Sequence, residues 1–254
     1  MIKKNSRVRR FDPGSKDPFT ISRTRIQNFL DCERCFYVQN VKGVKDLRGL
    51  PFRLNSATDT LLKKTFDVAR EKQVPHKYFK KEKINLVPFK HEKMDEWREN
   101  FKGIKYEYKK SNLMVQGAVD DILINLDTKA LSPIEFKSTQ TKDGEQTKYL
   151  GKPHHKFWKN QLEVYGYLLE KNGFKVSKDA FIVFCNADIS LEDWKESLNF
   201  DVYVINYKMN YSWVEPTLDK IKKLLLDKKV PDFSDPDNCD MCRFIVDQKE
   251  AGAL

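Results

Sequence analysis

Hydrophobic positions recur along the chain with a helical period in some segments and as short apolar runs in others. The helical spacing predicts helices over Thr20–Asn40, Ser56–Arg70, Pro88–Phe101, Lys156–Lys171 and Val214–Lys228. The apolar runs, bounded by turn residues, predict strands over Ile104–Tyr108, Leu113–Leu126, Ala180–Cys185 and Val202–Tyr207, with one more around Ile134 and Phe136. This order of elements predicts an α/β fold in which helices flank a mixed central sheet.

Charged residues interrupt two of these apolar strands. Asp120 precedes the run Ile122–Ile124, and Glu135 and Lys137 alternate with apolar residues on the next strand. One interpretation is a solvated hairpin in which Glu135 and Lys137 form an ion pair. The apolar neighbours argue instead for central strands, where charged side chains are rarely tolerated without a function. Two carboxylates and an amine brought together by a hairpin suit a magnesium-dependent phosphodiesterase.

The segments G-A-V-D at 117–120 and E-F-K at 135–137 resemble the core motif of the PD-(D/E)XK nuclease superfamily, in the form found in its RecB-type branch. The resemblance implies a restriction-endonuclease-like core, with Asp120 and Glu135 as Mg²⁺ or Mn²⁺ ligands and Lys137 as the catalytic lysine. Asp121 is the rival of Asp120, because neighbouring strand residues face opposite ways and only one of them can reach a metal. The G-x-x-D register favours Asp120.

The predicted helix Lys156–Lys171 carries Gln161 and Tyr165 four positions apart, so both side chains lie on one side of it. Tyr165 also belongs to an apolar stripe, which favours a plain core role. The Q-x-x-x-Y pattern after the Glu-x-Lys strand resembles a further motif of RecB-type nucleases. That resemblance implies that Gln161 and Tyr165 help to fix the active site and contact DNA.

RecB-type nucleases usually carry a metal-binding histidine in a G-x-x-x-H pattern upstream of the core. In the matching segment of this chain, Asn55 stands at the glycine position and Asp59 at the histidine position. Asp59 is an oxygen donor suited to Mg²⁺ or Mn²⁺, and it shares a helix face with Leu62 and Phe66. The alternative is structural: Ser56 and Asp59 form an S-x-x-D pair that is typical of a helix start.

Four cysteines form two C-x-x-C pairs, roughly 200 positions apart: Cys32 with Cys35, and Cys239 with Cys242. This spacing predicts one four-cysteine centre that joins the N- and C-terminal segments. Met1–Arg10 lacks the apolar stretch of a signal peptide, which predicts a reducing cytoplasmic location and favours a metal site over disulfides. Cys185 lies in an apolar run and is predicted to be an inert core thiol.

A similar centre occurs in AddB-type and CRISPR-associated exonucleases, where one front cysteine and three C-terminal cysteines hold a [4Fe–4S] cluster. This chain has two front cysteines and two C-terminal cysteines. Cys32 stands at the front position of the pattern, and Cys35 stands in for its missing last cysteine. The resemblance favours a [4Fe–4S] cluster, and Zn²⁺ is the alternative because it also accepts four thiolates. The resemblance leaves protein partners in DNA repair, recombination or CRISPR adaptation unspecified.

Composition agrees with a nucleic-acid-binding protein. The formal net charge of the 254 residues is +10, which predicts an anionic partner such as DNA. No apolar stretch approaches the ~18 residues of a membrane span. Lys142, Lys148, Lys152 and Lys156, with His154 and His155, form a polar segment that either contacts phosphates or is a solvated loop.

These observations predict a basic flexible arm over residues 1–19 and a single nuclease domain over residues 20–254. The expected activity is metal-dependent hydrolysis of phosphodiester bonds, by exonuclease action on single-stranded DNA or DNA ends. Two alternatives remain open. One is a catalytically weak nucleic-acid-binding module with a structural zinc, which the missing histidine favours. The other is an RNA nuclease, which no residue excludes.

Overall fold

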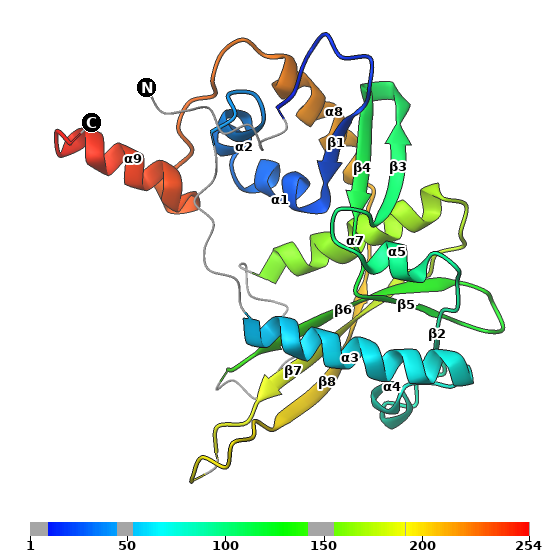
Figure 1. The fold of residues 1–254 in the computed structure, drawn as a ribbon. Helices are drawn as coiled ribbons and strands as arrows, with labels where there is room; N and C mark the ends of the chain where they lie inside the picture. Colours follow the sequence, from blue (N-terminus) through cyan, green and yellow to red (C-terminus); the bar gives the residue numbers. More distant parts are fainter. Residues whose placement is uncertain (1–9, 45–52, 142–154, 191, 254) are drawn as a thin grey trace. The chain divides into compact units, whose positions relative to one another are not determined.

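The computed structural model describes residues 10–44, 53–141, 155–190 and 192–253. The chain forms two compact units (Figure 1). Unit 1 contains Met1–Gly49, Glu107–Val115 and Ser212–Leu254, and unit 2 contains Leu50–Tyr106 and Gln116–Tyr211. The four cysteines of the C-x-x-C pairs lie in unit 1, and the residues of the predicted active site lie in unit 2.

Unit 2 is built on a mixed five-stranded sheet in the order β2-β5-β6-β7-β8. Its strands are β2 Val87–Pro88, β5 Asp121–Ile124, β6 Leu131–Thr139, β7 Asp179–Ala187 and β8 Phe200–Lys208. β6 and β7 run parallel, and the other neighbours pair antiparallel. Helix α7 lies between β6 and β7 in the sequence, as a parallel connection requires. The prediction of an α/β fold with a mixed sheet is confirmed.

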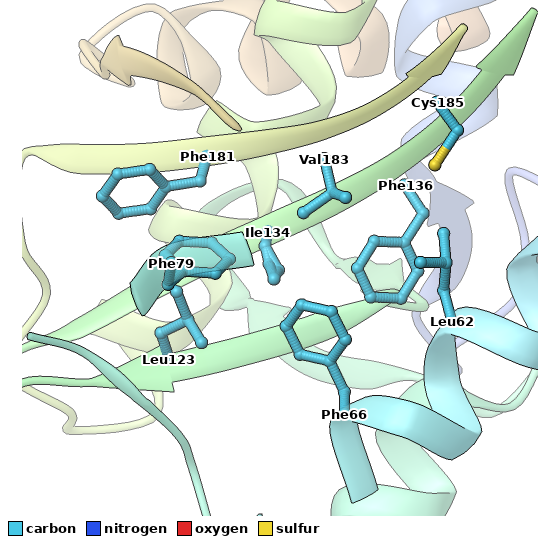
Figure 2. Packing of buried hydrophobic residues seen from close by; sticks show 9 residues of the cluster. All are labelled: Leu62, Phe66, Phe79, Leu123, Ile134, Phe136, Phe181, Val183 and Cys185. Carbon is cyan, nitrogen blue, oxygen red and sulfur yellow. The ribbon is translucent and has the colours of Figure 1, made fainter. Parts of the chain in front are cut away.

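Two helices cover the two faces of this sheet. Leu62 and Phe66 of α3 (Arg53–Lys72) pack with Phe181, Val183 and Cys185 of β7 (Figure 2). Trp158 and Leu162 of α7 (Lys156–Lys171) pack with the intervening β7 residues, Ala180, Ile182 and Phe184. Because side chains alternate along a strand, the two helices lie on opposite faces. β7 is therefore buried on both sides, which explains its continuous apolar sequence.

The remaining elements are shorter or belong to unit 1. A three-stranded sheet has the order β1-β4-β3. The elements are β1 Phe19–Ser22, α1 Arg23–Asp31, α2 Glu33–Asn40, α4 Lys77–Lys81, α5 Met94–Arg98, β3 Ile104–Tyr108, β4 Leu113–Gly117, α8 Val214–Leu226 and α9 Asp240–Glu250. In α8, Leu218, Ile221 and Leu225 are buried, in agreement with their helical spacing.

The predicted helix Thr20–Asn40 is wrong in detail, because the chain forms β1 and then two helices. Ser22 caps α1 by accepting a hydrogen bond from the Arg25 amide. Cys32 leaves the helical conformation and caps α2, and its sulfur accepts from the Cys35 amide at 3.3 Å. The break positions both sulfurs of the first C-x-x-C pair. Leu30 is exposed, although its spacing from Ile26 and Phe29 would put it on the same helix face.

The predicted strand Leu113–Leu126 is also wrong, because it divides into β4 and β5, which belong to different sheets. Between them, the Val119 amide donates to the carbonyl of Trp97 instead of continuing a ladder. The predicted helix Pro88–Phe101 shortens to α5. Pro88 pairs with Leu123 at the edge of the sheet, where a residue without an amide hydrogen is tolerated.

Two other sequence predictions concern the ends and the environment of the chain. Residues 1–9 of the predicted arm lie outside the described residues, and Phe11 is buried with its ring against Phe19. The assignment of residues 20–254 to one domain stays a prediction. Among the described helices, none combines the length and the apolar character needed to cross a lipid bilayer.

Candidate active site and metal centre

The antiparallel pairing of β5 with β6 brings the predicted catalytic residues together. Asp121 pairs with Ile134, so continuing the register by one residue puts Asp120 beside Glu135. Asp120 lies just before β5 and not on a strand as predicted. One oxygen of its carboxylate accepts a hydrogen bond from the Phe136 amide at 2.8 Å, as a strand carbonyl would do. The side chain of Asp120 is thus anchored to the strand that carries Glu135.

A polar cavity of about 480 Å³ opens beside these residues. Asp59, Asp120, Glu135 and Lys137 all line it. Glu135 is nearly fully buried, and its carboxylate forms an ion pair with Lys137. The ammonium of Lys137 also lies 5.8 Å from the centre of the Trp158 ring, within the range of a cation–π contact. The cavity therefore gathers three carboxylates and the predicted catalytic lysine.

Lys63 is a second cation at this site, and the sequence analysis missed it. Its ammonium lies 2.9 Å from Asp59 Oδ2 and 3.4 Å from Asp120 Oδ1. Burial and the neighbouring Asp120 raise the pKa of Asp59. Burial opposes the charge of Lys63, but Asp120 and Asp59 raise its pKa nonetheless. The spacing of Asp59 and Lys63, four positions apart on a helix, was a signal that could have identified the pair.

The structure excludes one of the two interpretations of Asp59, that of a helix start. Helix α3 begins at Arg53, so Ser56 lies inside the helix, and its carbonyl accepts a hydrogen bond from the Thr60 hydroxyl. The predicted helix start at Ser56 is therefore wrong. The assignment of Asp59 as a metal ligand stays a prediction.

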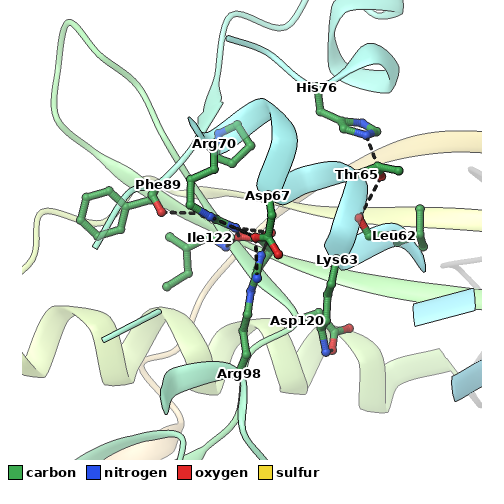
Figure 3. A network of polar contacts seen from close by, with 12 residues as sticks. Leu62, Lys63, Thr65, Asp67, Arg70, His76, Phe89, Arg98, Asp120 and Ile122 are labelled. Carbon is green, nitrogen blue, oxygen red and sulfur yellow. Dashed lines mark hydrogen bonds and ion pairs between the residues drawn. The ribbon is translucent and has the colours of Figure 1, made fainter. Parts of the chain in front are cut away.

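Asp121, the rival of Asp120, lies in a different environment. It is completely buried and does not line the cavity. Both its oxygens accept from Arg70 Nη2 at 2.8 Å, and Arg98 forms a further ion pair with it. Asp67 contacts both arginines, and Figure 3 shows Arg70 and Arg98 converging beside it. Asp121 is thus the centre of a buried ion-pair network, which the sequence analysis did not anticipate.

Gln161 and Tyr165 lie together on α7 but do not line the cavity. Both are buried, and Gln161 Nε2 donates to the Tyr165 hydroxyl at 2.7 Å. The Tyr165 ring packs against Gly117, where an added Cβ would lie only 3.0 Å from it. Gly117, the glycine of the G-x-x-D pattern, therefore lets α7 approach the segment that leads into Asp120. Contact of these two residues with DNA stays a prediction.

The predicted basic loop falls largely outside the described residues, since Lys142, Lys148, Lys152 and His154 all lie there. His155 is buried, and its ring stacks on Trp158 with the centroids 4.3 Å apart. Lys156, the first residue of α7, is exposed. His155 therefore packs in the core of unit 2, and Lys156 remains a candidate for phosphate contact.

The four cysteines of the C-x-x-C pairs converge in unit 1, as predicted. Their sulfur atoms all lie within 4.8 Å of one another. The Sγ–Sγ distances are 3.6 Å for Cys32–Cys242, 3.7 Å for Cys35–Cys239 and 3.9 Å for Cys35–Cys242. The four cysteines link segments 204 positions apart and are arranged to hold a metal ion.

The environments of the five thiols differ. Burial opposes ionisation of Cys32, but hydrogen bonds with Ser234 and the Cys35 amide lower the pKa of its thiol to about 7. Burial and the neighbouring sulfurs raise the pKa of Cys35. Cys185 lies alone in the core of unit 2, and burial raises its pKa to about 11. Cys185 therefore has the low reactivity of an ordinary core thiol.

Within the described residues, the cysteine cluster is the one group of three or more Cys, His, Asp or Glu that is this compact. The carboxylates of Asp59, Asp120 and Glu135 are spread more widely, with lysines between them. The donor types nonetheless suit different metals: thiolates suit Zn²⁺ or iron–sulfur clusters, and carboxylates suit Mg²⁺ or Mn²⁺.

Comparison with known proteins gives little guidance. No family model matches the chain, and no curated protein matches it. Similar solved structures include "Crystal structure of SSO0001", 14% identical, covering 92% of this chain and 88% of that one, with a TM-score of 0.42. They also include LHK-Exo in complex with dAMP, 10% identical, covering 91% of this chain and 93% of that one, with a TM-score of 0.36. At such low similarity, a function must come from the chain's own geometry.

The different environments of the neighbouring carboxylates predict different effects of their removal. Asp121→Ala leaves two buried arginines without their main partner and should lower the free energy of unfolding by about 3 to 5 kcal/mol. Asp120→Ala removes a partly exposed carboxylate and should cost far less. Urea denaturation of both variants measures the difference. Equal losses would contradict the assignment of Asp121 to a structural role.

Proposed function

We propose that this chain is a metal-dependent nuclease that hydrolyses phosphodiester bonds in DNA. The observation that carries the proposal is the β5–β6 register, which puts Asp120 beside Glu135 in a cavity that Lys137 also lines. The order β5, β6, α7, β7 supports it, because it is the strand, strand, helix, strand order of the restriction-endonuclease-like core that the sequence resembles. The net charge of +10 suits a polyanionic substrate.

In this proposal, Asp120, Glu135 and Asp59 hold Mg²⁺ or Mn²⁺. Such an ion, when bound, polarises the phosphate and lowers the pKa of a bound water. All three residues supply carboxylate oxygens, the ligands that these ions prefer. Asp120 is held by the Phe136 amide and Glu135 by its place on a central strand, so both residues are anchored beside each other at the cavity.

Lys137 has a separate role in the proposal. Its ammonium lies beside Glu135 and above Trp158, at the edge of the cavity. From there it can stabilise charge that develops on a phosphate oxygen, or orient the attacking water. Gln161 and Tyr165 have a supporting role in the proposal. Their side chains position α7 against the segment around Gly117. They contact DNA only if α7 becomes accessible.

For the cysteine centre we propose a single structural Zn²⁺, the alternative to the [4Fe–4S] cluster that the sequence resemblance favours. Four sulfurs at ~2.3 Å from one tetrahedral zinc lie about 3.8 Å from one another. The separations of 3.6 to 3.9 Å in unit 1 agree with this value. A four-iron cluster places irons and sulfides between the thiolates and keeps them farther apart.

The nuclease proposal predicts that substitutions that remove a charge from the site strongly slow cleavage. Asp120→Asn, Glu135→Gln and Lys137→Met should each slow Mn²⁺-dependent cleavage of single-stranded DNA by at least about a hundredfold. Lys137→Met should leave Mn²⁺ binding largely intact, because Lys137 is not a ligand. The measurement is the rate of cleavage of a labelled oligonucleotide, with an RNA of the same sequence in parallel.

Glu71→Gln is the control, because Glu71 of α3 is an exposed acid that pairs with an exposed lysine and does not line the cavity. It should cut at the wild-type rate. Cleavage of RNA alone would favour an RNA nuclease. Binding of DNA without cleavage by the wild-type protein would favour the binding module, and unchanged rates in all three variants would refute the assigned site.

The zinc proposal predicts that the four cysteines act as one unit. Alanine variants of Cys32, Cys35, Cys239 and Cys242 should each lose about one equivalent of zinc and lose stability, because the site links distant segments. The double variant of Cys32 and Cys239 should be little worse than either single one. Elemental analysis and thermal melting measure both effects, and Cys185→Ala should keep the metal. Brown protein that contains iron would instead indicate a cluster.

A further inference from the structure

The proposed function assigns Asp59 and Asp120 as ligands of a divalent cation. In the structure, the ammonium of Lys63 lies between their carboxylates. Its ammonium contacts Asp59 Oδ2 at 2.9 Å and Asp120 Oδ1 at 3.4 Å, and Figure 3 shows it directed at Asp120. Asp59 and Lys63 lie one helical turn apart on α3, whereas Asp120 comes from the segment before β5. One lysine thus links the helix to the segment that carries the main catalytic carboxylate.

This contact also sets the spacing of the carboxylates. Two oxygens bound to one Mg²⁺ at ~2.1 Å lie at most about 4.2 Å apart. An ammonium at hydrogen-bond distance from both oxygens tolerates a wider separation. The three site carboxylates are in fact too widely spread to form a compact ligand group in the described structure. Metal binding by all three carboxylates therefore requires that the group become more compact and that the ammonium between Asp59 and Asp120 leave.

We propose that Lys63 is a built-in counter-ion that competes with the divalent metal for Asp59 and Asp120 and thereby sets the metal affinity of the site. The inference rests on the proposed function, since it takes the same carboxylates as ligands. In the absence of metal, the single positive charge of Lys63 offsets part of the repulsion between two acidic groups. Its side chain is 22% exposed, so its flexible end can move toward solvent when a cation binds.

The charges around Lys63 indicate that Lys63 competes with a bound metal and does not assist metal binding. Asp59, Asp120 and Glu135 carry three negative charges, and Lys63 and Lys137 carry two positive ones within the same cluster. A divalent ion that enters beside Lys63 meets a like charge at close range, which disfavours binding. Lys137 forms its ion pair with Glu135, whereas Lys63 forms ion pairs with both Asp59 and Asp120, so Lys63 is the cation that the metal must displace from these two carboxylates.

The test is Mn²⁺ binding to the zinc-loaded, full-length protein without DNA, measured by titration calorimetry. Lys63→Met removes the charge and keeps the length of the side chain, and it should tighten Mn²⁺ binding at least tenfold. Lys63→Arg keeps the charge and should stay near wild type. Lys64→Met is the matched control, because Lys64 is the exposed neighbour on α3, and its affinity should not change.

Equal or weaker Mn²⁺ binding by Lys63→Met would overturn the inference. If wild-type binding is lost in Asp120→Asn while Lys63→Met fails to tighten it, only the role of Lys63 is wrong. If neither the wild type nor Lys63→Met binds Mn²⁺ in a way that depends on Asp120, the proposed metal site fails together with it. Should Lys63→Met not fold, Lys63→Gln removes the same charge, and the same increase in affinity is expected.

Discussion

The buried ion-pair network around Asp121 is the constraint on which the rest of the site depends. Asp121 begins β5, and two arginines hold its carboxylate in a place that water does not reach. A charge in such a place costs free energy unless it is fully paired, so arrangements that separate Asp121 from its arginines are disfavoured. It determines the direction of the chain at the start of β5. Asp120, one residue earlier, is thereby left free to reach the cavity and the Phe136 amide.

The parts of the fold that the sequence predicted well are those governed by local periodicity. Helix α7 has the bounds that its apolar spacing predicts, and β7 and β8 extend the predicted strands by only a few residues. The errors occur where a specific contact overrides the apolar period. The break between β4 and β5 depends on the carbonyl of Trp97, which is distant in the sequence. The break at Cys32 depends on a local contact, the sulfur that caps α2, which the apolar period does not encode.

The same distinction applies to the site. Asp120, Glu135 and Lys137 follow one another on paired segments, so a motif was enough to bring them together. The partners of Asp121 come from α3 and α5, 51 and 23 positions away, and no pattern in the sequence links them to it. Lys63 was likewise missed because its role depends on a contact with Asp120 from another element. Long-range ion pairs are set by the fold, and sequence spacing reveals only those within one helix.

The two candidate metal sites lie in different units and offer different ligands. Thiolates in unit 1 favour soft ions, and carboxylates in unit 2 favour hard ones, so the two proposed sites suit different metals. The central proposal is that a hard divalent cation binds between Asp120 and Glu135. Anomalous diffraction from crystals grown with Mn²⁺ tests it most directly. The account predicts a manganese peak within bonding distance of both carboxylates, with Lys63 turned away. A peak at the cysteines alone, or none in the cavity at saturating Mn²⁺, would contradict it.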